Sequence, residues 1–295
     1  MDDIEQQFEA FAGTFAVLEL VGLAFLVLIL GETVWDICIK NRTSYGETIA
    51  NFIIAAGNSL LDRTVYGLVF VLGLFITQDY AFFEIRTAWW NWILAIVAAD
   101  FTYYWMHRAE HEIRILWAYH SIHHSSPEFN LTTGLRLAWI EGAIEWIFFV
   151  PMILLGFGTV QTIIALAIVV IYQTWIHTEK IGKLGCLDRV FNTPSVHRVH
   201  HGSNKQYHDK NYGGILMLWD RFFGTYKSEQ EAVIYGITTP VGTWNPLIIN
   251  FHEFGKIFKE VKHSKSVSDA FGYVCKRPGW KPEADTNKTE SLGSD

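Results

Sequence analysis

Five long apolar segments alternate with shorter polar segments along this chain. A helix that crosses a bilayer needs about 20 mostly apolar residues. The segments near this length cover residues 15–39, 49–77, 88–106, 137–156 and 159–176. Asp62 and Arg63 interrupt the second segment, where they could pair with each other or face the interior of a bundle. The pattern therefore predicts an all-α protein, an integral membrane bundle of about four to five spans.

Positive charge indicates how this bundle is oriented. Lys40 and Arg42 follow the first apolar segment, and short cytoplasmic loops carry an excess of such residues. With that loop in the cytoplasm, five spans bring residues 107–136 and the polar chain after His177 to the same side. We therefore expect a helical cap on the cytoplasmic face, and a miscount of one span would divide it between two faces.

The C-terminal part of the chain has a different pattern. Between residues 246 and 261 apolar side chains recur at steps of three and four, namely Leu247, Phe251, Phe254, Phe258 and Val261. This spacing predicts an amphipathic helix that either packs on the cap or lies in the plane of the lipid headgroups. The tail at 277–295 has few apolar residues, and we expect it to be disordered. The remaining regions are N-terminal spans at 1–84, a histidine-rich domain at 85–236 and the amphipathic region at 237–276.

Composition agrees with a membrane protein. The chain is 50% hydrophobic and only 18% charged, whereas soluble domains contain about 25% charged residues. A net charge of -7 gives no reason to expect nucleic acid as a partner. Cys38, Cys186 and Cys275 are far apart in sequence, which argues against a disulfide framework and a thiolate zinc site. The acidic start at residues 1–5 predicts no cleavable signal peptide.

Eight of the twelve histidines fall into three short clusters. The clusters are His107 and His111; His120, His123 and His124; and His197, His200 and His201. Residues three and four apart share one face of a helix, so each cluster can direct several imidazoles at one ion. Together the clusters supply enough nitrogen for two metals. His177 is either a ninth ligand or an interfacial residue with its ring tip in water. Imidazole suits zinc, copper, iron and nickel, so the spacing alone does not choose the metal.

Several polar residues near the clusters are candidates to orient the ligands. They are Asn130, Arg136, Glu141, Glu145, Asp209 and Asn211. The two glutamates, four residues apart, could hydrogen-bond ligand imidazoles or reach water at the interface. We expect the asparagine and arginine that follow the second cluster to position the site without binding metal. The last two residues either orient the third cluster or only form a turn.

These motifs resemble the membrane-bound fatty acid hydroxylase/sterol desaturase superfamily, whose pattern is His-x-x-x-His followed by two copies of His-x-x-His-His. The stretches that carry the resemblance are Tyr104-Trp-Met-His-Arg-Ala-Glu-His-Glu112, His120-Ser-Ile-His-His-Ser-Ser126, Asn130-Leu-Thr-Thr-Gly-Leu-Arg136, Trp175-Ile-His-Thr-Glu179, Asn192-Thr-Pro-Ser195, His197-Arg-Val-His-His-Gly202, Asp209-Lys-Asn-Tyr-Gly-Gly214 and Trp219-Asp-Arg-Phe-Phe-Gly-Thr225. The similarity covers about residues 85–228 and implies that 85–236 is a catalytic domain. Within the superfamily it is strongest to the branch that cleaves alkylglycerol ether lipids.

The resemblance implies two iron ions held by the histidine clusters. The clustered histidines would be catalytic as metal ligands, and the reaction would use dioxygen and two electrons to hydroxylate a lipid C–H bond. The electron donor would be tetrahydrobiopterin, a cytochrome or a ferredoxin. A multi-pass protein of this kind would lie in the endoplasmic reticulum of a eukaryote or the inner membrane of a bacterium, with its active site facing the cytoplasm.

Three alternatives use the same residues differently. A sterol or fatty-acid hydroxylase or desaturase would need only a differently shaped substrate channel. A histidine-rich membrane metal-binding or transport protein is a non-enzymatic possibility, although transporters hold ligands near the membrane midplane and these clusters lie at span ends. A zinc hydrolase is a further possibility, but the chain contains no serine nucleophile motif and no H-E-x-x-H.

Overall fold

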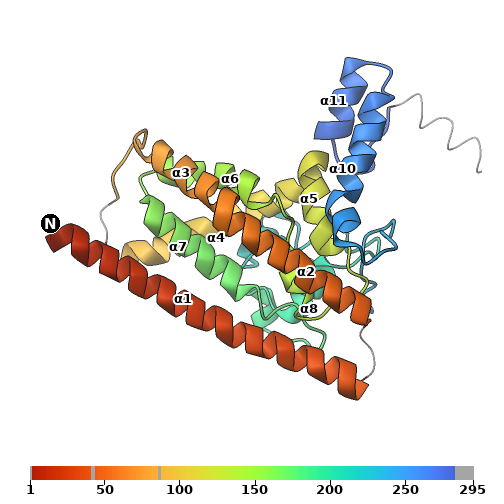
Figure 1. Cartoon of the computed structure of the whole chain (residues 1–295), viewed down its shortest axis with the longest axis horizontal. Coiled ribbons are helices and arrows are strands. Elements are labelled where there is room, and N and C mark those ends of the chain that lie inside the picture. The colour runs from red at the N-terminus through yellow and green to blue at the C-terminus, as the bar shows by residue number, and fades with distance from the viewer. Residues whose placement is uncertain (1, 41–43, 86–87, 283–295) are drawn as a thin grey trace, which may run out of the picture.

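The computed structural model describes residues 2–40, 44–85 and 88–282 (Figure 1). Within these ranges the protein consists of helices and connecting turns, without a β-strand. Two isolated β-bridges join Phe191 to Leu216 and Gly202 to Tyr235. The expectation of an all-α fold is therefore confirmed.

The N-terminal region contains two long helical segments. The first is α1 (Asp2–Trp35), which continues as a π-helical turn (Asp36–Lys40). The second joins α2 (Tyr45–Leu61) through a π-helical turn (Asp62–Tyr66) to α3 (Gly67–Gln78). The acidic and basic pair noted in the sequence thus lies in a π-turn, a distortion that is frequent at functional sites.

The remaining helices form the rest of the bundle and a cap at one end of it. The bundle helices are α4 (Trp89–Glu112), α6 (Gly142–Leu154) and α7 (Thr159–Tyr172). The cap contains α5 (Arg114–His124), α8 (Pro194–His200), α9 (Leu218–Phe223), α10 (Pro246–Lys262) and α11 (Val267–Cys275). Short 3-10 turns cover Thr133–Leu135 and Leu187–Arg189.

Two helical segments are long and apolar enough to cross a membrane, Leu20–Ile39 and Tyr45–Gln78. The helices α6 and α7 have 13 and 14 residues, so each is about 20 Å long, less than the roughly 30 Å of a hydrocarbon core. The start predicted for the fourth span, residue 137, is too early, because Trp139 lies in a turn. The backbone N–H of Trp139 donates to the Asn250 side chain, and its indole N–H donates to the Ile54 carbonyl. The full number of spans remains a prediction.

The bundle packs around small residues and large apolar side chains. Ala95 and Ala99 of α4 are fully buried beside Phe149 of α6 and Val169 of α7. Small side chains let helices approach closely, which favours packing where the surrounding lipid is itself apolar. The helix α4 runs past the predicted end of its span, so its last two turns carry His107 and His111 into the cap.

A second core joins the cap to α2. It contains Ala50 and Ile54 of α2, Tyr119 and Ile122 of α5, and Ile249 of α10. The predicted C-terminal helix is present. The expectation that the tail is disordered from residue 277 is wrong for 277–282, because Trp280 packs on Gly272 and Tyr273 of α11. The rest of that tail, 283–295, lies outside the described residues.

Candidate metal centre

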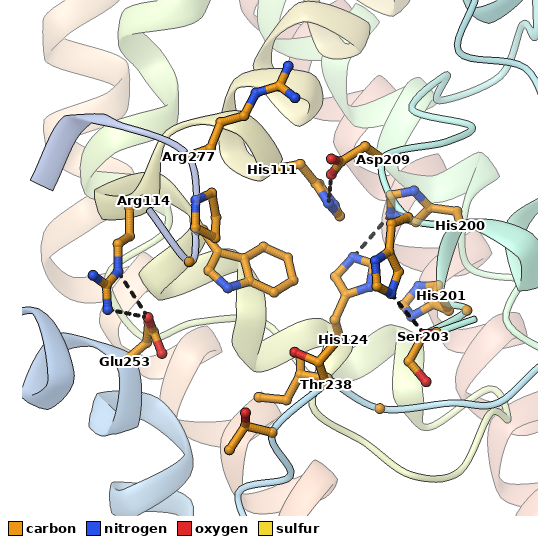
Figure 2. A pocket seen from close by; sticks show the side chains of 18 of the residues that line it. His111, Arg114, His124, His200, His201, Ser203, Asp209, Thr238, Glu253 and Arg277 are labelled. Carbon is orange, nitrogen blue, oxygen red and sulfur yellow. Dashed lines mark hydrogen bonds and ion pairs between the residues drawn. The ribbon is translucent and has the colours of Figure 1, made fainter. Parts of the chain in front are cut away.

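Nine buried histidines converge where the bundle meets the cap, and they form two groups. The first contains His107, His111, His120, His124 and His200, and the second contains His123, His177, His197 and His201. Within each group the facing ring nitrogens all lie within 4.8 Å of one another. The rings come from α4, α5, the turn after α7 and α8, so the structure brings together all nine positions considered from the sequence. Figure 2 shows four of them facing one pocket.

The spacing of the nitrogens fits metal coordination. In the first group, Nε2 of His120 lies 3.0 Å from Nε2 of His107 and 3.1 Å from that of His124. In the second, Nε2 of His177 lies 2.9 Å from Nε2 of His197. Two ligands of one ion, with bonds of about 2.1 Å, are about 3.0 to 3.4 Å apart when they are neighbours. The observed distances therefore fit imidazoles that share one ion within each group.

The other ring nitrogens fix which atom faces the site. Nδ1 of His107 donates to the Tyr212 carbonyl, that of His177 to the Gln173 carbonyl, and that of His200 to the Lys210 carbonyl, each at 2.9 Å. A neutral imidazole has one N–H, so Nε2 of these rings carries a lone pair. Lone pairs that face one another at about 3 Å repel unless a cation lies between them. The residues present therefore fit a pair of bound metal ions.

Burial keeps the rings in the form that binds metal. Removal from water lowers the pKa of His107 and His177 to about 4. It lowers the pKa of the other seven rings well below the ordinary value of 6.5. Since a protonated imidazole has no free lone pair, the neutral rings are ready to bind metal at neutral pH.

Glu110, which the sequence motifs did not single out, supports the first group from the side opposite the metal centre. Its carboxylate lies 3.1 Å from Nδ1 of His120 and accepts a 2.7 Å hydrogen bond from the Tyr119 hydroxyl. Carboxylates that accept from a ligand imidazole orient the ring and raise its basicity. The available signal was the position of Glu110 between His107 and His111 on one helix.

Substitution of Glu110 by glutamine should weaken metal binding at the first group by about 10- to 100-fold, because the amide no longer carries the negative charge that supports His120. Metal retained by the purified protein against a graded chelator series would measure this. Glu112→Gln is the matched control on the same helix, since Glu112 pairs with Arg108 and Arg277. Equal retention by both variants would contradict the role of Glu110.

The predicted positioning residues occupy different places. Arg136 is buried and donates to the Ile122 carbonyl and Ser125 Oγ at the end of α5, each at 2.9 Å. It also donates to Asn51 of α2 at 2.8 Å and to Glu47. Asn130 accepts from the Thr132 backbone and hydroxyl and so shapes the loop before Arg136. Among the described contacts, neither Asn130 nor Arg136 bonds an imidazole through its side chain.

Asp209 and Asn211, which precede the Gly213 turn, lie near different histidine clusters. Asp209 and Asn211 both adopt the left-handed conformation, with φ values of 58° and 60°. Asn211 donates to the Val196 carbonyl at 3.0 Å, beside His197. A carboxylate oxygen of Asp209 lies 4.0 Å from Nδ1 of His111. Both residues therefore form the turn, and a role for either in orienting a ligand stays a prediction.

Two cavities reach the histidines from different directions. The polar cavity, of about 400 Å³, is lined by His111, His124, His200 and His201 with Arg114, Lys256 and Arg277 (Figure 2). The apolar cavity, of about 480 Å³, is lined by the other five histidines and by side chains of α3 and α7 that include Phe70, Ile163, Leu166 and Val170. The metal centre is therefore open to two separate compartments.

The apolar cavity also contains the two glutamates noted in the sequence. Glu141 accepts from the backbone of Ala138 at 2.9 Å, and Glu145 hydrogen-bonds Glu141. Both side chains line the cavity, and among the described contacts neither bonds an imidazole, so their role in orienting ligands stays a prediction. Asp62 from the π-turn lines the same cavity, and the described lining residues include neither lysine nor arginine.

Comparison with known proteins places this site in a family. The fatty acid hydroxylase family model matches residues 92–225. The chain is 41% identical to alkylglycerol monooxygenase of Homo sapiens over 71% of this chain and 47% of that protein, and 41% identical to its counterpart in Danio rerio over 89% and 58%. It is 30% identical to an ornithine lipid hydroxylase of Rhizobium tropici over 50% of this chain and 46% of that protein.

These matches define both the extent and the limit of the similarity. The chain spans about half the length of the alkylglycerol monooxygenases that it matches. No solved structure matches this chain. The matched segment contains all nine histidines of the metal centre. Residues 92–225, and with them the whole centre, belong to the fatty acid hydroxylase family.

Proposed function

We propose that this protein is a membrane-bound di-iron oxygenase that hydroxylates a C–H bond of a lipid. The observation that carries the proposal is the convergence of nine neutral imidazoles, in groups of five and four, beside an apolar cavity. Each group would hold one iron ion. Two iron ions, when bound, supply the oxidation of a C–H bond by dioxygen and two electrons, with water as the second product.

The apolar cavity fits a lipid substrate. Phe70, Leu166 and Val170 offer an apolar wall for an alkyl chain that enters between α3 and α7. The carboxyl groups of Glu141 and Glu145 can hydrogen-bond hydroxyl groups, and the described lining offers a phosphate neither lysine nor arginine. An alkylglycerol, with an uncharged head and an ether-linked chain, satisfies both requirements. Hydroxylation of the carbon beside the ether oxygen would give a hemiacetal that separates into an aldehyde and glycerol.

The polar cavity fits the entry of electrons. Charged side chains line it, namely Arg114, Lys256 and Arg277 together with Asp209 and Glu253, and it touches four ligand rings that the apolar cavity does not. We propose that tetrahydrobiopterin, a cytochrome or a ferredoxin delivers electrons from this side. In the five-span topology this side faces the cytoplasm, in the endoplasmic reticulum of a eukaryote or the inner membrane of a bacterium.

Lipid profiles of cells that express the wild type or His123→Ala, with reduced pterin added, test this proposal. We expect alkylglycerols to accumulate in the variant, because His123 belongs to the second group of ligands. An unchanged ether-lipid pool with altered sterols or fatty acids would instead favour the second candidate, a sterol or fatty-acid hydroxylase or desaturase. Purified protein should contain two irons per chain. Tightly held zinc without oxygen consumption would overturn the oxygenase and favour a hydrolase or a metal-binding protein.

A further inference from the structure

The helix α10 has two apolar faces, and the described part of the chain covers only one of them. The covered face includes Ile249 and Ile257, which are buried against the cap. The other face, which we call the outer stripe, consists of Leu247, Ile248, Phe251 and Phe258. Phe258 is 69% exposed and Leu247 is 59% exposed. A contiguous apolar patch of this kind on a protein surface marks a contact with a partner or a membrane.

The depth of α10 in the fold is fixed by its contacts with α2. Ile249 packs with Ala50 and Ile54 of α2, and the ring of Trp244 lies against Gly46. Since α2 begins at Tyr45, Ala50 and Ile54 are about 8 and 14 Å along it at 1.5 Å per residue. The start of α10 therefore lies beside the first turns of a helix that is apolar enough to span a bilayer.

The outer stripe of α10 lies beside exposed apolar side chains in the first turns of α2. Ile49, which is 57% exposed, and Ile53 point away from the protein on α2. Trp139 connects the two helices, because its indole bonds the Ile54 carbonyl and its ring lies 6.4 Å from that of Phe251. In the view of Figure 1, α10 runs across the direction of α1 at the end of the bundle that carries the cap. This is the orientation of a helix in the plane of a membrane surface.

Charge at the edge of the stripe suits lipid headgroups. Lys259 and Lys262 are exposed. Lys259 lies beside the stripe, and Lys262, four residues after Phe258, lies on the same face at the C-terminal end of the stripe. Exposed Trp244 precedes the helix, and indole rings favour the interface between headgroups and acyl chains. Lysine beside an apolar face is typical of helices that bind anionic membrane surfaces.

We propose that the bilayer itself covers the outer stripe, so that α10 is an in-plane helix seated at the headgroup level. The helix is also tied to the metal centre, because Glu253 pairs with Arg114 at 3.1 Å at the start of α5 and both line the polar cavity. Lipid contact along α10 would thus hold one wall of the polar cavity against the membrane. This inference does not depend on which lipid is oxidised.

Fluorescence quenching tests the proposal in the full chain, reconstituted into nanodiscs of phosphatidylcholine and phosphatidylglycerol. The native cysteines are replaced by serine, and a single bimane label is placed through Phe258→Cys or Phe251→Cys. Lys256→Cys is the control on the same helix, on the side turned toward the polar cavity. We expect doxyl-labelled lipid to quench the stripe labels at least about threefold more strongly than aqueous iodide does, and the order to reverse at position 256.

Two results would overturn the proposal. Iodide quenching at Phe258→Cys as strong as at Lys256→Cys would place the stripe in water. Protection of the stripe labels from both quenchers would mean that a second copy of the chain or another protein covers it. Failure of the proposed oxygenase function would leave the quenching pattern unchanged, so the two outcomes can be told apart.

Discussion

Alanine in place of His200 is expected to abolish turnover, with a loss greater than about 100-fold. Loss of a residue that only hydrogen-bonds a metal ligand already lowers metal affinity or activity by about 10- to 100-fold. His200 is itself placed as a ligand, so a larger effect is expected. Its Nε2 lies 3.1 Å from that of His124, and its ring centroid lies 4.3 Å from that of His107. The variant leaves four rings in the first group and does not touch the second.

The measurement is lipid oxidation in membranes together with iron per chain in the purified protein. We expect iron to fall from two ions toward one, because the second group stays intact. His263→Ala is the control, since His263 is an exposed residue at the end of α10 that bonds the Lys259 carbonyl. Retained turnover in His200→Ala, with normal turnover in the control, would remove His200 from the ligand set.

Helical spacing was enough to find the ligands but not their grouping. The first two clusters lie on helices, and the third lies on α8 with His201 as its C-terminal capping residue, as the three- and four-residue steps predicted. The division into groups of five and four follows from tertiary contacts, which place His123 with His177 and leave its neighbour His124 with His200. Adjacent residues on a helix point about 100° apart, so one cluster can serve two ions. No local pattern determines which ion each ring faces.

Glu110 shows a second limit of sequence analysis. A glutamate between two histidines on a helix is ordinarily read as a solvated residue, because glutamate is seldom buried without a partner. Here α5 folds back against α4, and the Tyr119 hydroxyl and His120 ring meet the carboxylate. The partners come from the next helix, so the burial of Glu110 depends on the turn at Ile113 between them.

The predicted length of the fourth apolar helix was wrong for a similar reason, because contacts with distant residues decide where the helix begins. Apolar composition continues from Leu137 to Gly156, but α6 covers only Gly142–Leu154. Polar backbone at residues 138–139 is satisfied by Glu141 and Asn250, so the chain can leave the helix there without losing hydrogen bonds. Hydropathy counts residues suited to lipid and does not record these partners.

Methionine in place of Arg136 is expected to destabilise the protein by about 3–5 kcal/mol, the range for a buried ion pair that loses one member. Glu47 would remain as a buried carboxylate without its guanidinium partner. Asn51 and the Ile122 carbonyl would each lose a donor as well. Since Arg136 joins α2 to the end of α5 that carries His123 and His124, iron retention should fall with stability.

Denaturant unfolding in detergent micelles, with and without bound metal, measures the change. Arg277→Met is the matched control, because Arg277 forms an exposed pair with Glu112, and such pairs contribute only about 0–1 kcal/mol. The double variant Glu47→Gln with Arg136→Met should recover part of the loss, since it removes the uncompensated charge along with its partner. A loss in Arg136→Met no larger than in Arg277→Met would mean that the buried pair does not hold α5 against α2.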